Sequence, residues 1–316
     1  ILVGLLYYQL VHVRSGISEV MLSFFMAEIL AISILFIPTV PNFKFAFNLA
    51  YLKEFIKFSL PLIGGSMAFI VFMNIDRIIL AQYVNLVEMG VYGIGFMFGS
   101  VAGIIVTANM SAYLPRVKKL MAKGDEIEVK KLTTHYIEEI QHLMLIVIFI
   151  ITIFNDLTIY LFANNYNSSL AAMVMVGVAI GHLARSRYLF FKQILFLKNK
   201  TNNIFINEIV TLVIGFIIGI VLIKYFGVLG GAFLAILTYI FMNVISYMQI
   251  KKFNLIDINF RSLFKTCIFV LLILVLEFNK NENSIFNFYI WVKSLELLIM
   301  LLLLNSFYKI FHRNIN

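Results

Sequence analysis

Long apolar segments alternate with short polar loops along the whole chain. A helix needs about 20 mostly apolar residues to cross the ~30 Å hydrocarbon layer of a bilayer. Runs such as LMLIVIFIITIF have high strand propensity, but their length and the need to satisfy every backbone group inside lipid favour helices. The pattern therefore predicts an all-α fold, a polytopic membrane helix bundle of about ten transmembrane helices. The predicted segments are 1–11, 20–37, 58–80, 90–114, 143–162, 170–197, 204–223, 229–250, 263–278 and 285–308.

Composition supports lipid as the solvent. Hydrophobic residues make up 62% of the 316-residue chain and charged residues only 13%, whereas about a quarter of a soluble domain is charged. The single cysteine, Cys267, excludes a disulfide framework and a thiolate metal site. The chain begins without Met, a basic segment or a cleavage site. We therefore expect no signal peptide, and a sequence that starts within a hydrophobic helix and is N-terminally truncated.

The basic residues predict the orientation of the chain. Most of the 25 Lys and Arg residues lie in every second loop, and the intervening loops hold only Arg14, Lys224 and Lys280. Cytoplasmic loops carry the Lys and Arg excess, so the basic loops and the C-terminus are predicted to be cytoplasmic. The net charge of +9 is thus spread over short loops, which argues against nucleic acid as a partner. The longest basic loop, 115–141, is predicted to be either a surface helix or a solvated connector.

The segment 58–80 combines helix-breaking and charged residues. Pro61, Gly64 and Gly65 predict a helix break, which is typical of transport sites and equally of structural kinks. Asn74, Asp76 and Arg77 follow in the same segment. Because charges in a bilayer normally face a partner or a wet cavity, we predict that these three line a substrate path or join helices. The alternative is that they reach the outer headgroups.

Other ionisable residues lie in segments that are otherwise apolar. Arg185, Arg187 and Lys192 lie in the inner part of segment 170–197, where they either bind an anionic substrate or extend to the cytoplasmic face. Glu208 and, less strongly, Glu28 are candidates for a coupling carboxylate or for an interhelix hydrogen bond.

Glycines spaced by four residues predict close helix packing. One stripe holds Gly95, Gly99 and Gly103, and a second holds Gly215 and Gly219. The sequence shows no phosphate-binding loop, zinc-binding pattern or serine nucleophile elbow. We therefore expect no catalytic residue, no metal and no cofactor.

Three stretches carry a family resemblance. KEFIKFSLPLIGG, NIDRIILAQYVNLVEMGVYGIGF and IKYFGVLGGAFLAILTYI resemble the polysaccharide flippases, the O-antigen and capsule repeat-unit exporters of the multidrug/oligosaccharidyl-lipid/polysaccharide transporter superfamily. The matching residues are Ser59-Leu60-Pro61, Asp76-Arg77, Gly90-Val91-Tyr92, Gly227, Gly230 and Gly231.

The resemblance implies about fourteen helices in two pseudo-symmetric lobes and a trailing pair. On that basis residues 1–37 are the last two helices of the first lobe, and 38–57 are a cytoplasmic connector. Residues 58–250 are the second six-helix lobe, and 251–316 are the two trailing helices and tail. The first four helices are then missing.

The resemblance also implies a function. Such proteins move undecaprenyl-pyrophosphate-linked oligosaccharide across the bacterial inner membrane by alternating access, for lipopolysaccharide and capsule synthesis, alongside other polysaccharide assembly proteins. Arg77 is the residue carried over first, because it lies in the matching motif, and an arginine can meet a pyrophosphate with paired hydrogen bonds. Asn74 or Asn109 would bind sugars. Membrane lipids are the other expected partners.

Two further functions stay open. A cation-coupled drug exporter of the same superfamily would depend on intramembrane carboxylates. A membrane glycosyltransferase or polysaccharide polymerase would need a large outer loop with catalytic residues, but the predicted outer loops are short.

Overall fold

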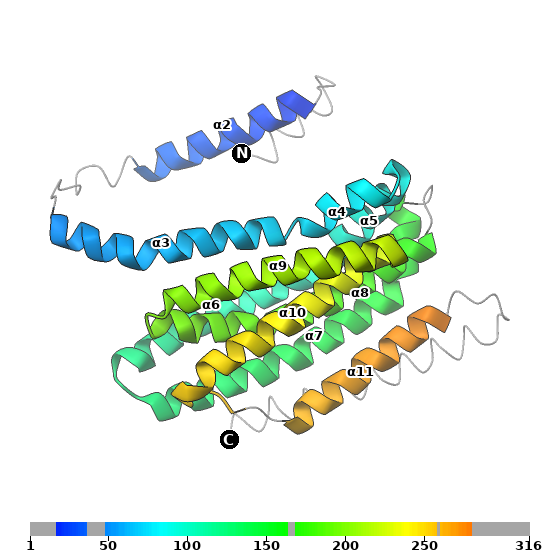
Figure 1. Cartoon of the computed structure of the whole chain (residues 1–316). Coiled ribbons are helices and arrows are strands. Elements are labelled where there is room, and N and C mark those ends of the chain that lie inside the picture. Colours follow the sequence, from blue (N-terminus) through cyan, green and yellow to red (C-terminus); the bar gives the residue numbers. More distant parts are fainter. Residues whose placement is uncertain (1–16, 37–47, 164–167, 258–259, 280–316) are drawn as a thin grey trace. The chain divides into compact units, whose positions relative to one another are not determined.

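The computed structural model describes residues 17–36, 48–163, 168–257 and 260–279 (Figure 1). Every regular element in these ranges is helical, which confirms the predicted all-α membrane fold. The predicted segments 1–11 and 285–308 lie outside the described residues. The elements are α2 (Ile17–Phe36), α3 (Leu49–Phe72), α4 (Ile75–Tyr83), α5 (Leu86–Gly99), α6 (Val101–Ala122), α7 (Glu126–Ala163), α8 (Ser168–Leu197), α9 (Thr201–Phe226), α10 (Val228–Ile250), η3 (Lys251–Phe253) and α11 (Phe260–Asn279).

The chain divides into two compact units, residues 1–54 and 55–316. In the first, α2 is a largely exposed apolar helix, and its Glu28 side chain is exposed. The second unit contains the remainder of α3 and the helices α4 to α11. The candidate site described below lies in this second unit.

Six candidate membrane spans occur among the described residues. They are Leu49–Tyr83, Leu86–Ala122, Glu126–Phe162, Ser169–Leu197, Thr201–Phe226 and Val228–Phe253. The expected count of about ten is not reached within the described part of the chain, where Phe24–Ile34 and Phe264–Val275 are apolar helices of less than full span. The outer surface of α9 is apolar, with 53% of Val213 and 60% of Ile217 exposed, as contact with hydrocarbon chains requires.

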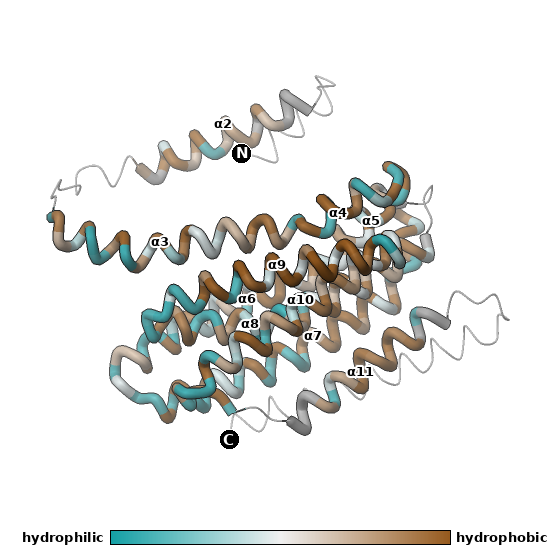
Figure 2. The backbone as a smooth tube through the Cα atoms, in the orientation of Figure 1, coloured by the Kyte–Doolittle hydropathy of each residue, from teal (hydrophilic) through white to brown (hydrophobic). Residues whose placement is uncertain are grey.

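The basic segment 115–141 is neither a separate surface helix nor a solvated connector. α6 continues to Ala122, a short turn reverses the chain, and α7 begins at Glu126 and runs without interruption into the next span. Val129 and Ile137 are buried in the bundle, so apolar positions at helical spacing extend the packed part of α7 into this segment. Figure 2 shows hydrophilic positions gathered at this turn and at the neighbouring ends of α9 and α10.

The helix break predicted at Pro61, Gly64 and Gly65 is wrong in position. α3 continues through all three residues, and the interruption lies at Met73 and Asn74, between α3 and α4. A proline removes one backbone hydrogen bond, and membrane helices tolerate that loss where neighbouring helices compensate for it.

Asn74 accounts for the observed interruption. Its backbone N–H donates to the Val71 carbonyl at 3.1 Å, a tighter turn than an α-helix makes. Its side-chain Nδ2 donates to the Ile70 carbonyl at 2.9 Å. Asparagine side chains compete with the backbone for such carbonyls, so the residue ends one helix and starts the next. The interruption therefore lies directly beside Asp76 and Arg77.

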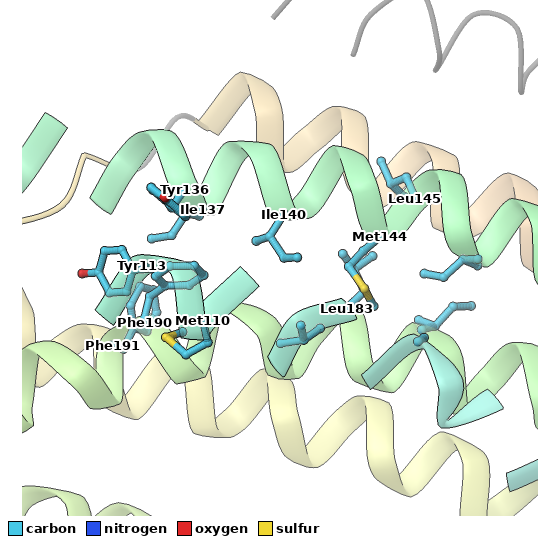
Figure 3. Packing of buried hydrophobic residues seen from close by; sticks show 14 of the residues in the cluster. Met110, Tyr113, Tyr136, Ile137, Ile140, Met144, Leu145, Leu183, Phe190 and Phe191 are labelled. Carbon is cyan, nitrogen blue, oxygen red and sulfur yellow. The ribbon is translucent and has the colours of Figure 1, made fainter. Parts of the chain in front are cut away.

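α8 is the central helix of the second unit. It packs against α5, α6, α7 and α10, and its neighbours lie alongside it in Figure 1. The core between α6, α7 and α8 is rich in aromatic residues: the Tyr113 ring lies 4.9 Å from that of Phe190 and 5.4 Å from that of Tyr136 (Figure 3). The Tyr113 hydroxyl also lies 2.9 Å from Thr133 Oγ1. These contacts hold the inner half of α8 in one orientation.

The predicted glycine stripes are confirmed as packing surfaces. A Cβ on Gly95 would lie 2.6 Å from the Ala171 carbonyl oxygen, and one on Gly99 would lie 2.5 Å from the Met175 carbonyl oxygen. Gly103 lies against the His182 ring in the same way. The stripe thus brings α5 and the start of α6 against the backbone of α8, with no room for a side chain.

We expect Gly99→Ala to lower the free energy of unfolding by about 1–3 kcal/mol, because the obstacle is a backbone carbonyl that cannot turn aside. Gly93→Ala is the matched control, since a Cβ at Gly93 meets nothing within 4 Å. Thermal unfolding of the purified protein in detergent micelles measures both. Equal midpoints for the two variants would contradict the close approach.

Candidate functional site

The polar residues of α8 lie on one face of that helix. His182, Arg185, Tyr188 and Lys192 recur every three or four residues, which is the spacing of a single helical face. Arg187 follows Arg185 by two residues and is turned about 200° around the axis from it. Of the three cations predicted in this segment, Arg185 and Lys192 lie on this face, whereas Arg187 lines a separate groove between α7, α8, α10 and α11.

The first part of the site is the Glu208 cluster, consisting of Glu208, Lys192, Tyr188, Arg185 and Phe69. Lys192 Nζ lies 2.5 Å from Glu208 Oε1, and the Tyr188 hydroxyl donates to the same oxygen at 3.0 Å. The Glu208 side chain is completely buried. A buried carboxylate is retained only when such partners offset its lost hydration. The pair holds α9 to α8.

One oxygen of Glu208 faces a glycine. Glu208 Oε2 has no hydrogen-bond partner among the described residues. It lies so close to Gly65 of α3 that a Cβ at that position would overlap it. Gly64, one residue earlier, lies against the Phe205 ring of α9. Gly65 therefore makes room for the carboxylate, which explains a glycine here without a helix break.

Two cations share one aromatic ring. The Arg185 guanidinium lies 5.6 Å and Lys192 Nζ lies 5.5 Å from the centre of the Phe69 ring. Arg185 Nε is buried without a hydrogen-bond partner, and no ion pair to Arg185 occurs in the described part of the chain. Glu208 is the one carboxylate of this cluster, so the cluster keeps an excess of positive charge inside the bundle.

The second part of the site is the Asp76 cluster, consisting of Asp76, Tyr92, Arg77, Asn74 and Phe96. Asp76 is 7% exposed and accepts a hydrogen bond from the Tyr92 hydroxyl on α5. The backbone N–H of Arg77 donates to its other oxygen at 2.8 Å. The Arg77 guanidinium lies 4.2 Å from the Phe96 ring centre and donates to Asn74 Oδ1 at 3.2 Å. Asp76 and Arg77 thus contact α5 separately instead of pairing with each other.

A small cavity lies next to the Asp76 cluster. It has a volume of about 40 Å³ and is lined mainly by apolar residues, with Asp76, His182 and Tyr239 as polar members of its lining. A space of this size with a few polar groups holds about one water molecule or a small ion. Its Tyr239 ring packs on Phe72, whose ring lies 6.0 Å from that of Phe69, so an aromatic row leads from this cavity to the Glu208 cluster.

The two clusters lie at different depths. Asp76 lies about 10 Å from the end of α4 at Tyr83, which the charge pattern assigns to the outer face. Lys192 lies about 8 Å from the end of α8 at Leu197, on the opposite face. The two clusters therefore lie toward opposite ends of the bundle.

Sequence reasoning missed three tyrosines of the site: Tyr92, Tyr188 and Tyr239. The sequence does carry a signal for two of them. Tyr92 and Asp76 are equally far from Val84, where the chain turns between α4 and α5, and antiparallel helices bring such positions together. Tyr188 follows the helical spacing of the α8 polar face. Asn109 lies on α6, and its buried Oδ1 has no hydrogen-bond partner among the described residues.

Comparisons with known proteins yield one informative match. No protein-family model and no curated protein matches the chain. Among solved structures it is similar to the lipid II flippase MurJ in its inward closed conformation, with a TM-score of 0.67 and 13% sequence identity. The match covers 99% of this chain, which spans 65% of the length of the flippase chain. At this identity the likeness establishes the shared helical membrane fold.

Proposed function

We propose that the protein is a transporter that flips a lipid-linked oligosaccharide from the inner to the outer leaflet by alternating access. The substrate is an undecaprenyl-pyrophosphate-linked repeat unit for surface polysaccharide, and the membrane is the bacterial cytoplasmic membrane with the C-terminus inside. Residues 58–250 act as one six-helix lobe, residues 1–37 belong to the other, and 251–316 are the trailing helices. The fold shared with a lipid flippase supports this proposal.

The observation that carries the proposal is the unpaired cation of the Glu208 cluster. Arg185 is held over Phe69 without a carboxylate partner among the described residues, next to the pair formed by Lys192 and Glu208. A pyrophosphate brings negative charge into a low-dielectric path, and a guanidinium meets it with two parallel hydrogen bonds. Arg77, stacked on Phe96, supplies a second cation nearer the outer face.

Glu208 gives this site a means of coupling. While its carboxylate is ionised, it holds the Lys192 ammonium. Protonation of Glu208 weakens that pair and frees Lys192 to contact the phosphate beside Arg185. Binding of substrate and protonation of Glu208 then favour one another, which couples a proton to the transport step. Sugar hydroxyls would be bound by Asn74.

A cation-coupled drug exporter is the second candidate, and Asp76 favours it. This buried carboxylate lines the 40 Å³ cavity and has no ion pair among the described residues. A site of that kind can hold a coupling cation. The experiment below therefore includes a readout for drug resistance.

The test is complementation of a flippase-deficient bacterium with the protein at its full natural length. We expect the parent protein to restore surface polysaccharide, and Arg77→Ala to trap lipid-linked repeat units at the inner leaflet, because it removes a cation from the substrate path. Arg116→Ala, an exposed arginine at the cytoplasmic end of α6, is the control and should complement fully. If the parent leaves polysaccharide unrestored and raises resistance to cationic drugs, the exporter replaces the flippase.

A further inference from the structure

A large cavity of the second unit lies away from the site described above. It has a volume of about 620 Å³ and lies between α7, α8, α10 and α11. Its walls are mainly apolar, with Leu183 and Phe191 on α8 and Val270 on α11. At its rim, 53% of Val244, 72% of Met248 and 61% of Leu271 are exposed among the residues that the structure describes. The cavity is therefore a groove that opens sideways between α10 and α11.

One cation lies in the wall of this groove. Arg187 Nε is buried without a hydrogen-bond partner, and no ion pair or hydrogen bond to the Arg187 side chain occurs in the described part of the chain. An unpaired guanidinium within an apolar wall costs several kcal/mol unless an anion or water compensates it. Two acidic residues, Glu138 and Asp257, also line the groove. Asp257 is paired with Lys130 at 2.7 Å, Glu138 has an interaction of its own, and neither forms an ion pair with Arg187 among the described residues.

Arg187 lies in the half of α8 that ends at Leu197. The residue lies about 15 Å from the end of α8 at Leu197. That end and the nearby end of α10, followed by Lys251 and Lys252, form the predicted cytoplasmic face. A phosphate that enters the groove from this face would meet Arg187, and the apolar walls would accept an acyl chain.

We propose that this groove binds a phospholipid of the inner leaflet, with its phosphodiester on the Arg187 guanidinium and an acyl chain along α10 and α11. A ligand with a phosphate group is favoured, because a guanidinium and a phosphate form two parallel hydrogen bonds. A ligand from the surrounding bilayer is favoured, because the groove opens sideways and a lipid can enter it without crossing the helix bundle. The site is distinct from the Arg185 face of α8, because the two arginines point in opposite directions.

The test uses a phospholipid with a photoreactive diazirine in one acyl chain. The full-length protein is reconstituted into vesicles of phosphatidylethanolamine and phosphatidylglycerol containing this probe, irradiated, and its adducts are mapped by mass spectrometry. We expect adducts on the groove segments of α10 and α11, and a loss of about tenfold or more in Arg187→Ala. Arg187→Lys should retain part of the yield, and Arg116→Ala should retain all of it.

Cys267 provides an independent readout. It is the single cysteine of the chain and lines the groove. In delipidated detergent solution we expect fast alkylation of Cys267 by a maleimide, and protection when phosphatidylethanolamine is added back. Val244→Trp fills the rim and leaves Arg187 in place, so it should abolish the adduct even if Arg187→Ala proves too unstable to purify.

Three results would overturn the proposal. One is an unchanged adduct yield in Arg187→Ala protein that elutes like the parent. Another is displacement of the adduct by a long-chain isoprenyl phosphate but not by unlabelled phospholipid, which would assign the groove to a different lipid. The third is a Cys267 that stays protected without any lipid, which would mean that another part of the protein covers the groove.

Discussion

Arg185→Ala is expected to lower the rate of lipid-linked oligosaccharide flipping by about tenfold or more. Arg185 is the cation of the Glu208 cluster without a carboxylate partner in the described chain, so its charge is available to the substrate. Its removal leaves Lys192, which Glu208 neutralises at 2.5 Å. The measurement is the flipping of a fluorescent pyrophosphate-linked oligosaccharide in vesicles that contain the full-length protein.

Two comparisons separate substrate binding from packing. Arg185→Lys keeps the charge and the position over Phe69 but loses the paired hydrogen bonds, so it should fall between the parent and the alanine variant. Thermal unfolding should change little in Arg185→Ala, because the guanidinium has no ion-pair or hydrogen-bond partner among the described residues and loses only its contact with the Phe69 ring. An alanine variant that unfolds several degrees lower yet flips substrate at the parental rate would assign Arg185 to packing alone.

The positions of several membrane helices could be predicted from the sequence, because segments that cross a bilayer are apolar along most of their length. The predicted segment 170–197 corresponds to α8 (Ser168–Leu197), and 229–250 to α10 (Val228–Ile250). The interruption at Asn74 could not be predicted in the same way. Proline and glycine are stronger breakers by propensity, yet α3 stays helical through them, with Gly64 and Gly65 lying against Phe205 and Glu208 of α9. The length of α7 was missed because charged residues in its first turns mask its buried positions.

The charged residues of the site could be predicted more easily than the residues that they contact. Glu208, Lys192 and Asp76 are identifiable because charges inside apolar segments are rare. The pair formed by Lys192 and Glu208 follows from symmetry about the turn at Lys200, in the same way as the pair of Asp76 and Tyr92. The sequence could not show that Arg187 and Arg185 have different surroundings. Both are cations at a similar depth of one segment, and the surroundings of Arg187 depend on where α11 packs.

The second large effect is expected from Gly65→Ala. A single methyl group at this position would overlap Glu208 Oε2, and the Phe205 backbone behind it lies 3.3 Å away. The carboxylate must therefore move, and its contacts with Lys192 and Tyr188 lengthen. We expect the free energy of unfolding to fall by about 1–3 kcal/mol, from strain and from the disturbed buried pair. Flipping should fall with it, because the displaced carboxylate no longer holds Lys192 in place.

A double-mutant cycle shows whether the loss runs through Glu208. Glu208→Ala removes the group that the methyl would strike, so Gly65→Ala should cost far less stability in that background than in the parent. Gly93→Ala controls for the change in helix propensity, since nothing lies within 4 Å of its added Cβ. Thermal unfolding in micelles gives the stability and the vesicle assay gives the transport rate. Additive effects of Gly65→Ala and Glu208→Ala would mean that α3 and the carboxylate act independently, and the coupling assigned to Glu208 would then need another cause.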